Sequence, residues 1–94
     1  MPKAEKFTLV ASDFFKKRYR KLIKGNILLE KRIDKTLHQL SIDPYYAGLK
    51  THKVADVRSS WVTGDVRILW EFEESEVRVI DLLDIGGHGI VYRK

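Results

Sequence analysis

The chain has 94 residues, a hydrophobic fraction of 44% and a formal net charge of +5. A chain of this length builds one hydrophobic core, so we expect residues 1–94 to form a single domain. The absence of cysteine excludes disulfides and thiolate zinc sites and is typical of a reducing compartment. No apolar run approaches the ~20 residues that span a bilayer, and no signal-peptide core follows the first residues. The sequence therefore predicts a soluble cytoplasmic protein.

The positive charge lies in the first half of the chain. Residues 1–47 have 11 Lys and Arg against 5 Asp and Glu, whereas residues 48–94 have 7 against 8. A basic surface favours a nucleic-acid, ribosomal or acidic-protein partner and does not choose among them. The simpler alternative is a solvated helix face.

The first predicted elements are a short strand and a helix. Phe7, Leu9 and Ala11 alternate along the chain, as in a strand with one apolar face. Ser12 is typical of a helix start, because its side chain can accept from the free amides of the first turn. The helix ends at Gly25, which enters the left-handed conformation freely.

A second helix is predicted to begin at Asn26 and to end before Pro44. Its apolar stripe has the spacing i, i+4, i+8 and i+11 and consists of Leu29, Ile33, Leu37 and Leu40. Two amphipathic helices joined by a two-residue turn should form a hairpin that packs on a sheet.

The second half of the chain is predicted to form strands. Residues 49–57 are a broken candidate and residues 59–62 a short one. Residues 66–72 alternate, with Val, Ile, Trp and Phe on one face. Residues 76–85 are apolar on both faces in their middle, which is typical of an inner strand. We expect Gly86-Gly87 to break this strand.

Residues 91–92 are a candidate for a last short strand pairing. The resulting order, β-α-α-β-β-β, predicts an α+β domain. Its N-terminal strand would be followed by a two-helix hairpin and an antiparallel sheet of three to four strands.

Three clusters hold the side chains that are suited to chemistry. The first places His52 between Lys50 and Lys53, and the third places His88 in a glycine loop that is followed by Tyr92. The second lies around a predicted hairpin and contains Arg58, Trp61, Asp65 and Arg67.

RNA cleavage by the 2′-hydroxyl of the RNA itself needs only such side chains. A base takes the hydroxyl proton, an acid protonates the leaving 5′-oxygen, and cations stabilise the charge on the phosphate. Histidine suits both proton-transfer roles, and arginine binds phosphate in bidentate fashion. No metal or cofactor is required. The sequence has no phosphate-binding P-loop, no serine-hydrolase elbow and no zinc motif.

Each candidate also has a structural interpretation. His38 is expected to be structural, His52 suits either interpretation, and His88 favours function because exposed loops at strand ends often carry sites. Trp61 is suited either to stacking on a base or to covering the sheet, whereas the alternation places Trp70 in the core. For Asp84 we expect a structural hydrogen bond.

Three segments resemble the RelE/ParE superfamily of toxins: LKTHKV, VRSSWVTGDVRILWEFEE and VIDLLDIGGHGIVYR. The last segment is similar to a common ending of YafQ-like and RelE-like members, and the predicted element order agrees with their compact fold. The resemblance implies a toxin of a type II toxin–antitoxin pair. It further implies an enzyme that enters the 70S ribosomal A site and cuts mRNA there without a metal or cofactor.

The resemblance also implies roles for individual residues. His88 matches the C-terminal histidine, a candidate general acid, and Tyr92 matches the terminal aromatic residue that supports it or the mRNA. His52 matches the first histidine of YafQ-like toxins, and Asp65 matches the aspartate that follows the central turn. Cations that match phosphate-binding or strand positions of RelE-like members are Arg58, Arg67, Lys50 and Lys53.

Two positions depart from the YafQ-like pattern. Trp61 stands where those toxins have a second histidine, and Val66 stands where they have a tryptophan. The identity of the general base therefore stays open among His52, Asp65 and a lysine that acts electrostatically.

The resemblance leaves two other functions open. A ParE-like protein would inhibit DNA gyrase without any chemistry, and a degenerate toxin would only bind its antitoxin. His88, Asp65 and the cations favour the enzyme, since a gyrase inhibitor needs no acid–base set. In every case the resemblance implies a cognate antitoxin, which binds as a disordered or helical segment that folds on the toxin.

Overall fold

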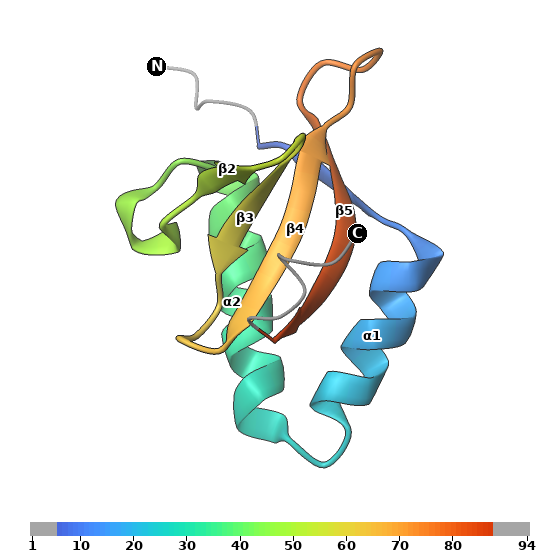
Figure 1. Cartoon of the computed structure of the whole chain (residues 1–94), viewed down its shortest axis with the longest axis vertical. Coiled ribbons are helices and arrows are strands. Elements are labelled where there is room, and N and C mark those ends of the chain that lie inside the picture. The colour runs from blue at the N-terminus through green and yellow to red at the C-terminus, as the bar shows by residue number, and fades with distance from the viewer. Residues whose placement is uncertain (1–5, 88–94) are drawn as a thin grey trace.

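The computed structural model describes residues 6–87, which form a five-stranded mixed sheet with two α-helices (Figure 1). The order of the elements along the chain is a strand, two helices and then strands, which confirms the predicted α+β class. The elements are β1 (Thr8–Ala11), α1 (Asp13–Ile23), α2 (Ile27–Ile42), the short 3₁₀ helix η1 (Ala47–Leu49), β2 (His52–Val54), β3 (Val57–Trp61), β4 (Val66–Phe72) and β5 (Val79–Gly87).

Side-chain caps begin both helices where the sequence predicts them. The Ser12 hydroxyl accepts from the backbone N–H of Phe15 at 3.0 Å, and the Asn26 side-chain oxygen accepts from that of Leu29 at 3.1 Å. Between the helices, Gly25 has a φ of 69°, a left-handed conformation that glycine adopts without steric cost. The helical hairpin is thus specified by local chemistry.

The strands lie in the order β1-β5-β4-β3-β2. Neighbouring strands from β2 to β5 are antiparallel, whereas β1 is parallel to β5, with Leu9 opposite Ile80. The two helices return the chain so that its first strand joins the sheet beside its last described one. The alternation of Phe7, Leu9 and Ala11 predicts the strand but does not indicate that β5 is its neighbour.

The core lies between α2 and the central strands. Ile33 and Leu40 of α2 and Ile68, Trp70 and Ile80 of the sheet are all fully buried. In Figure 1, α2 lies behind the sheet and α1 lies beside β5. The apolar stripe of α2 and the core position of Trp70 are therefore confirmed.

Two strand boundaries differ from the prediction. Gly86 and Gly87 do not break β5, because they pair with Arg67 and Val66 of β4. The adjacent strand supplies ladder hydrogen bonds that outweigh the weak strand preference of glycine. The broken candidate 49–57 begins with the last residue of η1 and contains β2 and the first residue of β3. Ala55, with a φ of 54°, turns the chain between the two strands. The predicted pairing at 91–92 lies outside the described residues.

Within residues 6–87, no helix combines the length and the apolar character that crossing a membrane would require.

Candidate functional site

The candidate site lies on the sheet face opposite α2. Successive side chains of a strand point to opposite faces, and directly paired residues share a face. Arg58 pairs with the buried Trp70 and so lies on the core face, whereas Trp61 pairs with Arg67 on the other face. We call this second face the open face.

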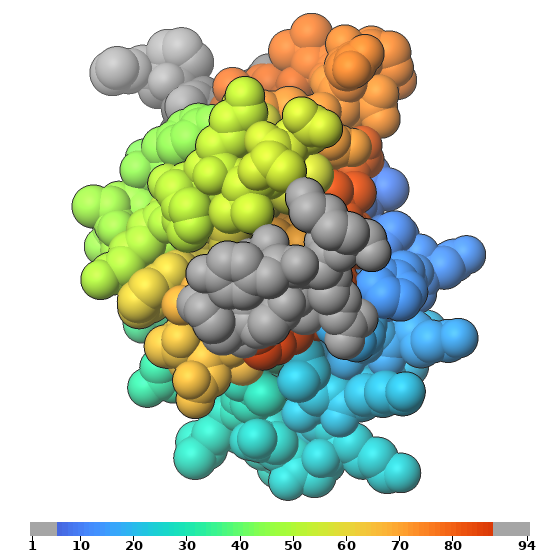
Figure 2. All heavy atoms as spheres, viewed as in Figure 1, coloured from blue at the N-terminus to red at the C-terminus, as the bar shows by residue number. Residues whose placement is uncertain are grey.

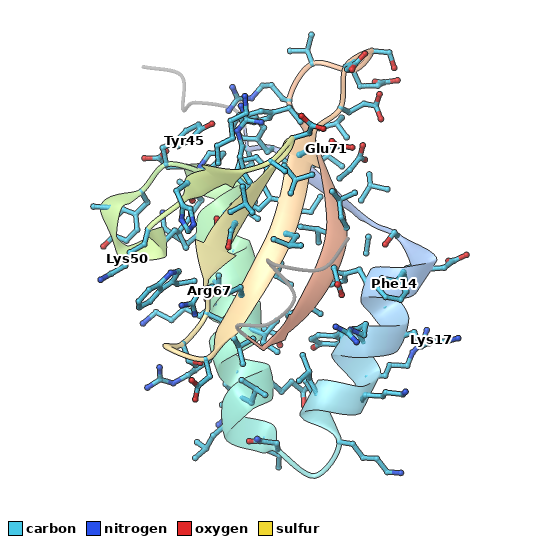
Figure 3. All side chains as sticks on the ribbon, viewed as in Figure 1. Phe14, Lys17, Tyr45, Lys50, Arg67 and Glu71 are labelled. Atoms are coloured by element: carbon cyan, nitrogen blue, oxygen red, sulfur yellow. The ribbon has the colours of Figure 1, made fainter. Side chains whose placement is uncertain are left out.

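Two cations lie over the ring of Trp61. The Lys50 Nζ is 4.6 Å from the ring centroid, and the Arg67 Cζ is 4.1 Å from it. Lys50 stands in the loop before β2 with a left-handed φ of 49°, and Arg67 lies on β4 (Figure 3). Cations within about 6 Å of an aromatic centroid are held there by the ring quadrupole. We call these three residues the Trp61 stack.

Arg67 is a buried cation that backbone carbonyls hold in place. Its side chain and backbone together are only 7% exposed, and its Nη1 donates to the carbonyl oxygens of Thr63 and Gly64 at 3.0 and 2.6 Å. No carboxylate of residues 6–87 forms a salt bridge with it. Its charge is thus oriented but not neutralised, which is the arrangement that attracts a phosphate.

His52 extends the open face along β2. It pairs with Ser59, which lies two residues before Trp61 and therefore on the same face. Its exposed ring places Nδ1 3.1 Å from the carbonyl oxygen of Lys50. A carbonyl can only accept, so this contact requires the proton on Nδ1 and leaves the lone pair on Nε2. A neutral His52 with this tautomer can take a proton.

Ser59 is a feature that the sequence did not single out. It is fully buried beside His52, and its hydroxyl has no hydrogen-bond partner among the described residues. Nothing in the sequence around a single serine in a strand indicates that its hydroxyl will be buried without a hydrogen-bond partner. The turn carbonyls of Thr63 and Gly64 were also missed, since backbone acceptors are invisible until the turn is folded.

Two predicted phosphate ligands lie apart from the Trp61 stack. The Arg58 Nε donates to the Tyr45 hydroxyl at 2.7 Å, and its guanidinium lies 5.1 Å from the Phe72 ring centroid, over the core aromatics. Lys53 pairs with Arg58 and is exposed on β2. The structure thus brings Lys50, Trp61 and Arg67 together, with His52 on the same face, and does not add Arg58 or Lys53.

Asp65 lies in the β3–β4 turn that holds Arg67. It is exposed, and its backbone N–H donates to the Thr63 hydroxyl at 3.1 Å. The same turn adjoins the end of β5, where Gly87 pairs with Val66. The remaining predicted catalytic residues, His88 and Tyr92, lie outside the described residues.

Carboxylates gather at the far end of β4 and β5. Hydrogen bonds from Ser75 lower the pKa of Glu73, whereas burial and a hydrogen bond with Glu73 raise the pKa of Asp81. Glu71 pairs directly with Asp81. In the described part of the chain, no group of three or more His, Cys, Asp or Glu side chains is arranged to hold a metal ion.

Asp84 has the structural role that the sequence predicted. Its Oδ1 accepts from the backbone N–H of Ile85 at 2.7 Å and from the Arg18 Nε of α1 at 3.2 Å. The ion pair between Arg18 and Asp84 joins α1 to β5.

Comparisons with known proteins identify solved structures that share the fold of this chain. No family model matches the chain, and no curated protein matches it in sequence. Solved structures do match. A YoeB/ParE toxin from Agrobacterium tumefaciens has a TM-score of 0.72 and 14% identity, over 86% of this chain and 98% of that one. A metal-bound toxin from Helicobacter pylori has a TM-score of 0.72 and 24% identity, over 89% and 97%.

YafQ from Escherichia coli, in its DinJ–YafQ complex, is also similar. Its TM-score is 0.67 at 18% identity, over 93% of this chain and 99% of that one. Each match spans most of both chains at an identity below 25%, so the likeness is one of fold. This chain has the fold of the YoeB/ParE and YafQ toxins, as the resemblance to the RelE/ParE superfamily predicted.

Proposed function

We propose that this protein is the toxin of a type II toxin–antitoxin pair and a metal-independent endoribonuclease that cuts mRNA. The observation that carries the proposal is the Trp61 stack. Arg67 is buried, oriented by two turn carbonyls and not neutralised, and it lies over a tryptophan ring on which a base can stack. The fold shared with YoeB/ParE and YafQ toxins supports the same conclusion.

The proposed reaction uses the 2′-hydroxyl of the RNA as nucleophile. His52 Nε2 takes its proton, the 2′-oxygen attacks the adjacent phosphorus, and the bond to the 5′-oxygen breaks to leave a 2′,3′-cyclic phosphate. His88 protonates the leaving 5′-oxygen, and Tyr92 supports the mRNA or this acid. Lys50 and Arg67 stabilise the extra negative charge on the phosphorus centre. Asp65 is the alternative base.

The proposal includes two partners. The solved complex of DinJ with YafQ is a toxin–antitoxin complex, and by analogy we expect a cognate antitoxin for this chain. We expect the substrate to be mRNA in the ribosomal A site, and hence a cytoplasmic protein. Lys53 and Arg58 would contact phosphates away from the cleaved bond.

The proposal is tested by inducing the protein without an antitoxin in a bacterial cell. Primer extension on translated and untranslated messages locates new 5′ ends. We expect growth arrest with cuts in translated codons, and loss of both in Trp61→Ala, His52→Gln and His88→Ala. Lys17→Ala is the matched control, because Lys17 is an exposed cation on α1, away from the open face (Figure 3).

The outcomes separate three functions. Arrest without RNA cuts would reject the nuclease and favour gyrase inhibition. No arrest with wild-type protein would favour a degenerate toxin that only binds its antitoxin. Cuts that persist in all three site variants would place the chemistry elsewhere on the molecule.

A further inference from the structure

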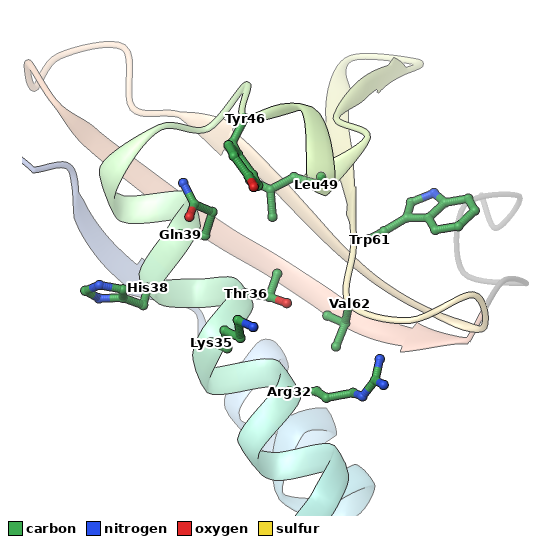
Figure 4. Close-up of a pocket in the computed structure, with 10 residues that line it drawn as sticks. Arg32, Lys35, Thr36, His38, Gln39, Tyr46, Leu49, Trp61 and Val62 are labelled. Carbon is green, nitrogen blue, oxygen red and sulfur yellow. The ribbon is translucent and has the colours of Figure 1, made fainter.

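A hollow of about 530 Å³ lies between α2, η1 and β3 (Figure 4). We call it the α2 pocket. Its volume lies within the roughly 300–1,000 Å³ that is typical of small-ligand sites. The residues that matter here are Arg32, Lys35 and Gln39 on α2, Tyr46 before η1, Leu49 in η1 and Trp61 on β3.

The α2 pocket is positively charged. Arg32 and Lys35 are one turn apart on α2, both are exposed, and neither forms a salt bridge with a carboxylate of residues 6–87. Among residues 6–87, no acidic side chain lines the hollow. Uncompensated cations in a concave site favour a phosphate, and Gln39 adds amide groups that can donate to one or accept from a base.

The α2 pocket also has an aromatic wall. Tyr46 is 51% exposed and lies across Gly48, where an added Cβ would be 2.7 Å from the Tyr46 Cε2. The missing side chain at Gly48 therefore allows the ring to lie close to the backbone, near the buried Leu49 (Figure 4). An exposed and supported ring beside cations is a platform for base stacking.

Trp61 joins this hollow to the candidate site. Trp61 is among the residues that line the α2 pocket, but its ring points away from the others (Figure 4), and Lys50 and Arg67 lie over that ring at 4.6 and 4.1 Å. A single strand whose reacting phosphate lies at Arg67 would pass Trp61 of β3 to reach Arg32 and Lys35 on the α2 side of the sheet. An acidic peptide would use the cations but has no need of a stacking platform.

We propose that the α2 pocket binds a nucleotide of the same RNA strand that lies beyond the nucleotides flanking the cleaved phosphate. Arg32 and Lys35 contact its phosphate, and Tyr46 stacks on its base. The proposal rests on the nuclease function and adds a subsite that makes binding depend on the length of the RNA.

Binding of 2′-O-methyl oligonucleotides tests this subsite without cleavage, because their 2′-oxygen cannot attack. Fluorescence anisotropy would compare a 3-mer, which fits the Trp61 stack alone, with a 9-mer of the same core sequence. We expect Arg32→Gln/Lys35→Gln to weaken 9-mer binding about tenfold and to lower its salt slope by about 0.7, because one phosphate contact is lost. Tyr46→Ala should also weaken the 9-mer about tenfold. The 3-mer should bind all variants equally.

Lys21→Gln/Lys31→Gln is the matched control, since it removes the same charge from exposed helix positions outside the α2 pocket. We expect it to bind the 9-mer within twofold of wild type. Equal losses in the two double variants would show general charge attraction and overturn the subsite, as would undiminished 9-mer binding in Arg32→Gln/Lys35→Gln. A Glu-rich decapeptide is the competing ligand. If its binding is lost in Arg32→Gln/Lys35→Gln while binding of the 9-mer is not, the pocket is assigned to an acidic protein instead. Wild-type protein that binds neither oligonucleotide would overturn the subsite, whereas the nuclease itself is judged by the cuts in cellular messages.

Discussion

The guanidinium of Arg67 joins local folding to proposed chemistry in one side chain. It donates to the carbonyls of Thr63 and Gly64, and it lies over Trp61. A lysine at this position would keep the charge but would lose the planar group that reaches both carbonyls and stacks on the ring. Arg67 is therefore the residue at which charge and geometry can be separated by substitution.

We expect Arg67→Lys to lower the single-turnover cleavage rate by about tenfold, and Arg67→Gln to lower it by about 10²–10³-fold. The second loss is the magnitude that follows removal of one preorganised donor to a developing oxyanion. The measurement is cleavage of an RNA under single-turnover conditions, with the melting temperature of each variant as control. Equal rates for arginine, lysine and glutamine would remove Arg67 from the reaction.

At the scale of elements, β4 and β5 place like charges side by side. Glu71 pairs with Asp81, and Glu73 shares a hydrogen bond with it. Because like charges directly opposite destabilise a sheet, this end of the β4–β5 ladder favours a protonated Asp81. Burial contributes most to the raised pKa of Asp81, followed by the two neighbouring glutamates.

This pKa shift has a definite sign for stability. Because the pKa of Asp81 is raised by folding, the folded protein keeps the proton at a pH where the unfolded chain has released it. The stability of the folded state therefore falls as pH rises past about 3.9, the ordinary pKa of aspartate. We expect Asp81→Asn to raise the melting temperature at pH 7 and to leave it unchanged near pH 3. The measurement is thermal unfolding across that range. An equal effect at both pH values would attribute the change to packing.

At the scale of the whole molecule, the two tryptophans have different roles. Trp70 is fully buried, its Nε1 donates to the Ser60 hydroxyl at 2.8 Å, and its ring packs against Phe72 at a centroid distance of 5.0 Å. Trp61 lies on the open face, with the cations of Lys50 and Arg67 over its ring. One therefore supports the fold, and the other is available to a ligand.

We expect Trp70→Ala to cost about 3–5 kcal/mol of unfolding free energy. This is a large part of the 5–15 kcal/mol that is typical of a whole domain, so the variant should be largely unfolded or strongly destabilised. The free energy of unfolding of Trp61→Ala should lie within about 1 kcal/mol of the wild-type value, which is the usual range for a partly exposed cation–π contact. Chemical denaturation of both variants is the test. A stable but inactive Trp70→Ala protein would contradict the core assignment.

The sequence by itself determined the elements with local causes. The caps at Ser12 and Asn26, the turn at Gly25, the stripe of α2 and the alternation of β4 all depend on neighbours within a few residues. The fold class followed from their order. The charged and aromatic candidates for the site, such as Arg67 and Trp61, could also be named from the sequence, and their roles stay predictions.

Only the tertiary structure decided which of those residues meet. The parallel pairing of β1 with β5, the inclusion of Gly86 and Gly87 in a strand, and the separation of Arg58 from the Trp61 stack all depend on strands far apart in sequence. The same holds for the α2 pocket, whose walls come from α2, η1 and β3. The periodicity of apolar residues indicates on which face of its strand a side chain lies. It does not indicate which strand is the neighbour, because strand partners are selected by the packing of the whole sheet.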